Sequence, residues 1–234
     1  YKITLKANTK VWQCFHNREE VMGARYPSAQ WSDNSVYEIN SSERPTKWCW
    51  GYDTFPSDPD DQYENGTIID NPHDNINLRL FVDTVKTINS NFTLDQALIH
   101  LNVGSFRSYT KSVKSTILET DDVIKLTYDP TDTWKTKHHH FYLENKLEFL
   151  NSENEWFYDK SKQELYIRLF NDEVPTLDNI RLKTQSYALD ITTNNVTLEN
   201  LNFFGTTFKA ENADNLLVTN CNFLYPSCYA HMVN

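Results

Sequence analysis

The sequence predicts an all-β protein, in which a β-rich N-terminal domain leads into the opening rungs of a parallel β-helix. Two observations support this prediction. Short stretches of alternating apolar and polar residues recur through residues 1–170, which is typical of half-buried strands. Residues 195–204 then recur in a related form at residues 215–224. A period of about 20 residues indicates stacked repeats, because one unit cannot bury its apolar face alone.

The repeat keeps its polar and apolar positions in phase. Its identical residues are Asn195, Asn200, Asn202 and Phe203, which recur as Asn215, Asn220, Asn222 and Phe223. Apolar residues alternate on both sides of Asn200, so each unit is predicted to be a strand, a corner and a second strand. Asn tolerates the left-handed conformation of a tight corner, and stacked Asn side chains can hydrogen-bond to one another. A leucine-rich repeat has a similar period, but its consensus and its helical half are missing.

The N-terminal domain is predicted to contain short strands joined by polar turns. We expect these strands at residues 1–5, 10–16, 36–39, 78–82, 98–103 and 123–128. An irregular insert is expected near residues 51–77, where prolines, acidic residues and Asn65-Gly66 interrupt the alternation. Residues 155–169 predict a β-hairpin, and a weaker first rung is expected at 180–191. The predicted domains are residues 1–170 and residues 171–234.

Several blocks of the N-terminal domain resemble a known superfamily. They are Val11-Trp-Gln-Cys-Phe, Met22-Gly-Ala-Arg-Tyr-Pro, Leu143-Glu-Asn-Lys-Leu-Glu-Phe-Leu, Glu155-Trp-Phe-Tyr-Asp and Glu164-Leu-Tyr-Ile. In order and content they are similar to the lead-in of right-handed parallel β-helix (pectin-lyase-like) proteins. The resemblance implies a right-handed helix joined to a β-domain. It implies no single function, because this superfamily contains polysaccharide lyases, glycoside hydrolases, viral spikes and surface proteins without known activity.

The chain departs from this superfamily pattern at two places. Cys14 stands where leucine is usual, which favours a disulfide particular to this relative. Asn151-Ser-Glu-Asn precedes Trp156 in place of the usual Asp-Pro-Gly approach. We therefore expect Asn154 to adopt the left-handed conformation that glycine would otherwise supply.

Composition and charge narrow the partners. The net charge of −10 argues against nucleic acid and anionic membranes, since both require a basic surface. No run of 18 apolar residues exists, so no membrane span is predicted. The chain begins without Met and stops inside what should be a third rung, so we expect a processed chain or a part of a longer one.

The four cysteines and the sequons suggest an extracellular protein. We favour the disulfides Cys14–Cys49 and Cys221–Cys228, although three pairings are possible. The alternative is that Cys14 and Cys221 are small buried apolar residues. The candidate N-glycosylation sites are Asn40, Asn65, Asn91 and Asn195. Their number is no higher than chance predicts, so only their positions are informative. Asn40 lies in a predicted loop, Asn65 in a turn and Asn195 at a rung corner, and Asn65 and Asn195 are the best placed for modification.

Three polar clusters have residue types that suit a chemical site, but their spacing favours a structural explanation for each. Glu199 and Glu211 could act as acid and base at a glycosidic bond, but solvated surface carboxylates are expected. The residues 138–140, all His, could bind a metal, but no further ligand has suitable spacing. The acidic residues of the insert could hold Ca²⁺, the one cofactor considered, but lack a calcium-loop order. They are Asp53, Asp58, Asp60, Asp61 and Glu64.

Aromatic residues suggest carbohydrate contacts, because a flat ring stacks on a sugar face. The candidates for stacking are Trp31 and Trp50. Burial in the domain core is the alternative, and we favour it for Trp48 or Trp50.

Three functions follow from these observations. The first is a secreted, N-glycosylated structural protein, such as a surface or filament subunit, that binds other copies of itself through exposed strand or rung edges. The second is a fragment of a polysaccharide lyase or glycoside hydrolase whose catalytic rungs lie beyond residue 234. The third is a carbohydrate-binding module with glycans as partners. No catalytic residue is assigned, and the chain itself is expected not to be an enzyme.

Overall fold

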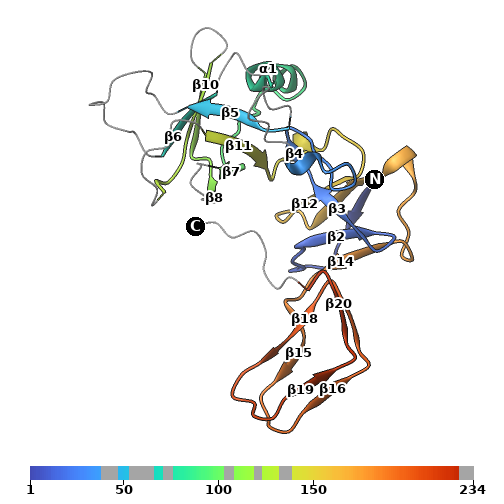
Figure 1. Ribbon diagram of the computed structural model, residues 1–234. Helices are drawn as coiled ribbons and strands as arrows, with labels where there is room; N and C mark the ends of the chain where they lie inside the picture. Colours follow the sequence, from blue (N-terminus) through green and yellow to red (C-terminus); the bar gives the residue numbers. More distant parts are fainter. Residues whose placement is uncertain are drawn as a thin grey trace.

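The computed structural model describes residues 1–37, 47–52, 66–70, 76–102, 108–118, 123–131 and 139–226. These residues form 20 strands, one α-helix and three short 3-10 helices (Figure 1). The prediction of a mostly β protein is therefore confirmed. Most strand pairs of the N-terminal part are antiparallel.

The first sheet has six strands in the order β1-β13-β12-β3-β2-β14. Their bounds are β1 Lys2–Thr4, β2 Gln13–His16, β3 Glu19–Gly23, β12 Glu155–Asp159, β13 Glu164–Arg168 and β14 Ile180–Lys183. β12 and β13 form the hairpin that the sequence predicts, and Asn154 before it has a φ of 58° as expected. β3 and β12 pair in parallel, so two of the blocks that carry the superfamily resemblance lie side by side.

The second sheet has eight strands, all paired antiparallel. Their bounds are β4 Arg25–Tyr26, β5 Cys49–Tyr52, β6 Thr67–Asp70, β7 Leu98–Asn102, β8 Ser108–Ser112, β9 Ser115–Leu118, β10 Ile124–Thr127 and β11 His139–Glu144. β11 is central, because it pairs with β4, β5 and β7. β6 lies inside the region expected to be an irregular insert. The largest apolar cluster among the described residues packs against this sheet.

Two predicted strands are helical instead. Residues 78–82 belong to helix α1, Leu78–Ile88, in which Leu78 and Val82 are buried. Apolar residues recur there with helical spacing, and the Asn77 side chain caps the first turn by accepting from the Leu80 N–H at 2.7 Å. The strand expected at 36–39 is, where described, the 3-10 helix η1, Ser35–Tyr37. The other 3-10 helices are η2, Leu147–Phe149, and η3, Phe170–Asp172.

The last strands form three parallel pairs, and we call residues 187–226 the C-terminal parallel unit. β15 Tyr187–Ile191 pairs with β18 Thr207–Ala210, β16 Thr197–Glu199 with β19 Leu217–Thr219, and β17 Asn202–Phe204 with β20 Asn222–Leu224. The unit extends away from the two sheets in Figure 1. Phe203 and Phe223 stack with 4.7 Å between their ring centroids. Phe203 also forms a small buried core with Ile191 and Leu198.

Asparagines hold the corners of the parallel unit, as the sequence predicts. Asn195, Asn200, Asn215 and Asn220 all have positive φ. Asn215 donates from Nδ2 to Oδ1 of Asn195 at 2.9 Å, and Asn220 donates to Asn200 in the same way. A third hydrogen bond of the same kind runs from Asn222 Nδ2 to Asn202 Oδ1 at 2.9 Å, and together the three form an asparagine ladder.

An aromatic contact joins the parallel unit to the first sheet. The ring of Phe15 on β2 lies 4.9 Å from Phe204 and 5.0 Å from Tyr225, measured between centroids. Gly205 completes this contact with a φ of +63°. A Cβ at Gly205 would lie 3.1 Å from the Phe15 ring, so the corner needs glycine both for its conformation and for space.

The predicted Cys14–Cys49 disulfide does not form, because the two residues lie in different cores. Cys14 is a free, buried thiol in the core of the first sheet, whereas Cys49 lies in the larger cluster of the second. Burial raises the pKa of the Cys14 thiol to about 12, which disfavours the reactive thiolate. Cys14 is therefore the small buried residue of the alternative interpretation. Cys228, the expected partner of Cys221, lies outside the described residues.

The cap of helix α1 gives a test of this fold. We expect Asn77→Ala to lower the free energy of unfolding by about 1 kcal/mol, because the Leu80 N–H loses its acceptor. Asn77→Asp keeps an acceptor and should stay close to the wild type. Urea unfolding of the three proteins measures both effects. Equal stability of Asn77→Ala and the wild type would contradict the capping role.

Candidate functional site

The described surface has a hollow of about 340 Å³ where the two sheets meet. Aromatic side chains dominate its lining, and we call it the aromatic hollow. They are Trp12, Trp31, Tyr37, Trp48, Tyr142 and Trp156. β3 and β12 of the first sheet contribute to its wall together with β11 of the second. Its size falls within the range of small-ligand pockets.

Two aromatic rings are displayed at the solvent side of the aromatic hollow. Trp31 is 45% exposed and Tyr37 is 71% exposed, and their ring centroids lie 6.1 Å apart. Ser35 fixes the turn between them: its Oγ accepts from the Gln30 N–H and its N–H donates to Asp33 Oδ1, both at 2.8 Å. The turn therefore holds two large apolar faces in water, where they are available to a ligand.

Arg25 is buried at the base of the aromatic hollow, with 2% of its surface exposed. Its Nε donates to the Pro27 carbonyl at 2.9 Å, and its Nη2 donates to the Lys47 carbonyl at 2.6 Å. The guanidinium lies 3.7 Å from the ring centroid of Tyr142 and 5.5 Å from that of Trp48. Burial lowers the pKa of Arg25, but an arginine remains charged at neutral pH.

Two carboxylates also line the aromatic hollow. His100 Nε2 lies 2.9 Å from a carboxylate oxygen of Glu144, within hydrogen-bonding distance. The His100 ring stacks on the Tyr142 ring, with 4.4 Å between their centroids. Glu20 Oε1 accepts from Gln13 Nε2 at 2.8 Å. Burial raises the pKa of Glu20, while the Gln13 hydrogen bond and the charge of Lys183 act in the opposite direction. The site thus combines stacking faces with carboxylate acceptors.

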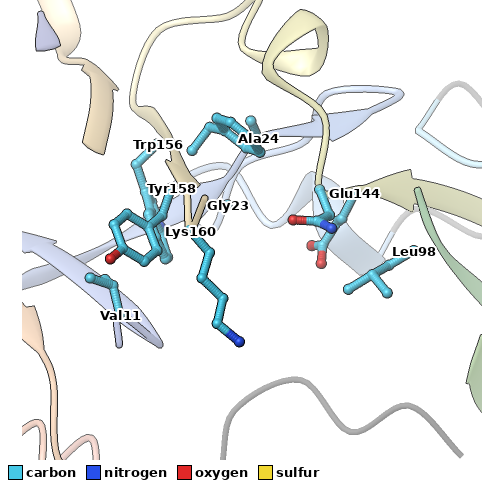
Figure 2. Close-up of a pocket in the computed structure, with 10 residues that line it drawn as sticks. Val11, Gly23, Ala24, Leu98, Glu144, Trp156, Tyr158 and Lys160 are labelled. Carbon is cyan, nitrogen blue, oxygen red and sulfur yellow. The ribbon is translucent and has the colours of Figure 1, made fainter. Parts of the chain in front are cut away.

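A smaller hollow of about 180 Å³ adjoins the aromatic hollow, because both are lined by Gly23, Glu144 and Trp156. Figure 2 shows Glu144 and Leu98 on one side of it, and the side chains of β12 on the other. Glu144 therefore lines both spaces.

Glu155 lies under this region on β12, next to Met22 of β3, and is fully buried. Its Oε2 accepts from the Ser152 N–H at 3.2 Å, whereas its Oε1 accepts no hydrogen bond within the described residues. Burial raises the pKa of Glu155 to about 7, against the smaller opposing effects of hydrogen bonds and the Arg25 charge. A carboxyl group that is partly unsatisfied in this way costs stability when it ionises.

The structure brings only some of the predicted site residues together. Trp31 lines the aromatic hollow, and so does the half-buried Trp48, although the sequence favours core burial for Trp48 or Trp50. The side chain of Trp50 lies outside the described residues. Glu199 and Glu211 are exposed, and Glu211 pairs with Lys209 at 2.8 Å. This agrees with the prediction of surface carboxylates.

The remaining predicted sites fall on the surface or outside the described residues. Asn91 and Asn195 are exposed, and their glycosylation stays a prediction. Asn40, Asn65, His138 and the acidic residues of the proposed calcium loop all lie outside the described residues. Within the described part of the chain, no three His, Cys, Asp or Glu side chains form a group that could hold a metal ion. None of its helices is long and apolar enough to cross a membrane.

Sequence reasoning missed Arg25, Tyr142 and Glu144 as site residues. Arg25 and Glu144 do lie in two of the blocks that carry the superfamily resemblance, so a signal was present. What was missing was their pairing: β4 and β11 place Arg25 directly opposite Glu144.

Comparisons with known proteins show the fold alone. No protein-family model and no curated protein matches the chain. A solved structure titled "Glycoside hydrolase" matches 86% of the chain with a TM-score of 0.56 and 14% sequence identity. The chain spans about a third of the length of that hydrolase, since the match covers 33% of it.

The buried Glu155 predicts a pH-dependent stability. Its folded pKa of about 7 lies above the usual glutamate value, so its favourable contribution is complete below about pH 4.3 and is lost as the pH rises through 7. We expect Glu155→Gln to be more stable than the wild type above pH 7, by up to the order of 3 kcal/mol, and similar to it near pH 4. Urea unfolding at both pH values measures this difference.

Glu153→Gln is the matched control, because this neighbouring side chain is partly exposed. It should change stability little at either pH. A Glu155→Gln protein that follows the wild type at every pH would contradict the burial of a charged carboxylate.

Proposed function

We propose that this chain is part of a carbohydrate-active protein and that it binds carbohydrate in the aromatic hollow. One observation carries the proposal: exposed Trp31 and Tyr37 stand beside a hollow that also contains carboxylates. A sugar has an apolar C–H face and a rim of hydroxyl groups. Aromatic rings fit the face, and carboxylate oxygens accept hydrogen bonds from the hydroxyls.

The glycoside hydrolase match supports this proposal at the level of fold. The chain spans only part of that protein's length, so we assign no catalytic pair within it. A polysaccharide lyase is the alternative activity for the whole protein. In either case we assign the described residues a role in binding the carbohydrate.

We further propose that the C-terminal parallel unit opens a right-handed parallel β-helix of the pectin-lyase-like kind. The parallel pairs offset by 20 residues, the asparagine ladder and the stacked Phe203 and Phe223 support this. The predicted boundary at residue 171 then shifts along the chain: β14 still pairs with β2 of the first sheet, and the parallel unit begins at β15.

Substitution of the displayed tryptophan tests carbohydrate binding. Trp31→Ala should weaken the binding of oligosaccharides about tenfold or more, because a ring-to-sugar stack is lost while the fold keeps its core. Isothermal titration with a panel of plant and bacterial oligosaccharides measures the change. Phe170→Ala is the matched control, because Phe170 is another exposed aromatic residue and does not line the aromatic hollow. Unchanged affinity in Trp31→Ala would remove the aromatic hollow as the binding site.

A second candidate is a secreted, N-glycosylated structural protein whose copies associate through exposed strands. One observation favours it: the outer strands β19 and β20 expose the apolar side chains of Leu217, Phe223 and Leu224. Exposed strand edges of this kind are able to pair with another chain. The exposed sequons at Asn91 and Asn195 would then carry glycans outside the cell.

Light scattering and glycopeptide mass spectrometry of the native protein test this second function. It predicts a mass that rises with concentration and glycans on Asn91 or Asn195. Leu217→Asn should reduce association, whereas Leu177→Asn, at an exposed residue outside the parallel unit, should not. A monomer at all concentrations, without glycans at either site, would contradict the structural function.

A further inference from the structure

The charges of the aromatic hollow indicate which class of carbohydrate it takes. We infer that the aromatic hollow binds neutral sugars and excludes uronic acids and other anionic sugars; this inference rests on the proposed function. Three charged side chains line the aromatic hollow, namely Glu20, Arg25 and Glu144. Their contacts decide what charge a ligand meets.

Arg25 is the one cationic side chain among the described residues that line the aromatic hollow, and the protein itself engages it. Its Nε and Nη2 atoms donate to backbone carbonyls, and one guanidinium face lies on Tyr142. With 2% of its surface exposed, Arg25 cannot present the two-pronged edge by which arginine recognises a carboxylate. It acts as a structural cation that holds the Pro27 and Lys47 segments in place.

The charge of Arg25 is also balanced from within the protein. Glu144 and Glu155 both act on Arg25 and favour its charged form. His100 Nε2 lies 2.9 Å from Oε2 of Glu144, and Thr110 Oγ1 lies 3.1 Å from the other ring nitrogen of His100. Among the described residues that line the aromatic hollow, therefore, no cationic excess remains to neutralise an anionic ligand.

Glu20 adds a carboxylate that faces the aromatic hollow from β3. The groups that act on it are Gln13, through a hydrogen bond at 2.8 Å, and the positive charge of Lys183. Lys183 lies on β14 and does not line the aromatic hollow. An anionic sugar would meet a like charge there, which repels it. The hydroxyl groups of a neutral sugar would donate hydrogen bonds to Glu20 without this repulsion.

Paired titrations with two oligosaccharide classes of equal length test the inference. The probes are neutral oligosaccharides of glucose, mannose or galactose and oligosaccharides of galacturonic or mannuronic acid. We expect the 234-residue protein to bind at least one neutral probe about tenfold or more tighter than any uronic probe at low salt. High salt should narrow the difference, because it screens the repulsion.

Glu20→Gln removes the charge that repels an anionic probe while it keeps a hydrogen-bonding group. It should narrow the difference between neutral and uronic probes about threefold or more. Glu19→Gln, at the exposed residue next to it on β3, is the matched control and should leave the difference unchanged. Circular dichroism checks that both variants fold. If Glu20→Gln does not fold, the salt dependence of the affinity difference in the wild type still tests whether charge repulsion excludes the uronic probes.

The outcomes separate the inference from the proposed function. Uronic probes that bind as tightly as neutral ones, with binding lost in Trp31→Ala, would overturn the neutral-sugar inference and retain a carbohydrate site. An affinity difference that neither salt nor Glu20→Gln changes would also overturn it. Failure of every probe to bind would overturn the inference together with the proposed function.

Discussion

The parallel contact between β3 and β12 is the constraint on which most of the N-terminal part depends. It joins Glu155 to Met22 and Trp156 to Gly23 in register. Trp156 strengthens it by donating from Nε1 to the Val21 carbonyl at 3.0 Å, across 135 residues of sequence. The contact attaches the β12–β13 hairpin to the β2–β3 hairpin. It also places Trp156 in the core of the first sheet and in the walls of both hollows.

The same contact explains why the site contains buried charges. β4 follows β3 directly, so the position of β3 carries Arg25 into the space opposite Glu144. Burial of a guanidinium and of Glu155 is unfavourable, and the protein offsets it with backbone acceptors, aromatic faces and nearby opposite charges. Hydrophobic replacements would be at least as stable in such a position. Arg25 is therefore better explained by the two chain segments that it holds in place, through its hydrogen bonds to the Pro27 and Lys47 carbonyls, than by a gain in stability.

The C-terminal parallel unit depends on a different balance. Its core is small, and its corners use backbone conformations that most residues avoid. Asparagine lowers that cost, because its side chain both tolerates the left-handed region and bonds to the asparagine one repeat away. Phe15 then fixes the unit to the first sheet through Phe204 and Tyr225.

The sequence by itself determined the local features: the β class, the 155–169 hairpin, the turn at Asn154 and the repeat with its asparagine corners. These features depend on the alternation of apolar and polar residues and on backbone conformations that only a few residue types adopt. A single short segment of the sequence is therefore enough to predict each of them. Only the tertiary structure decided that α1 replaces a strand and that Cys14 stays apart from Cys49. The aromatic hollow too is decided only by the tertiary structure, because Arg25, Trp31 and Tyr142 come from distant segments. The pairing of β4 with β11 that brings these segments together cannot be predicted from the sequence of any one of them.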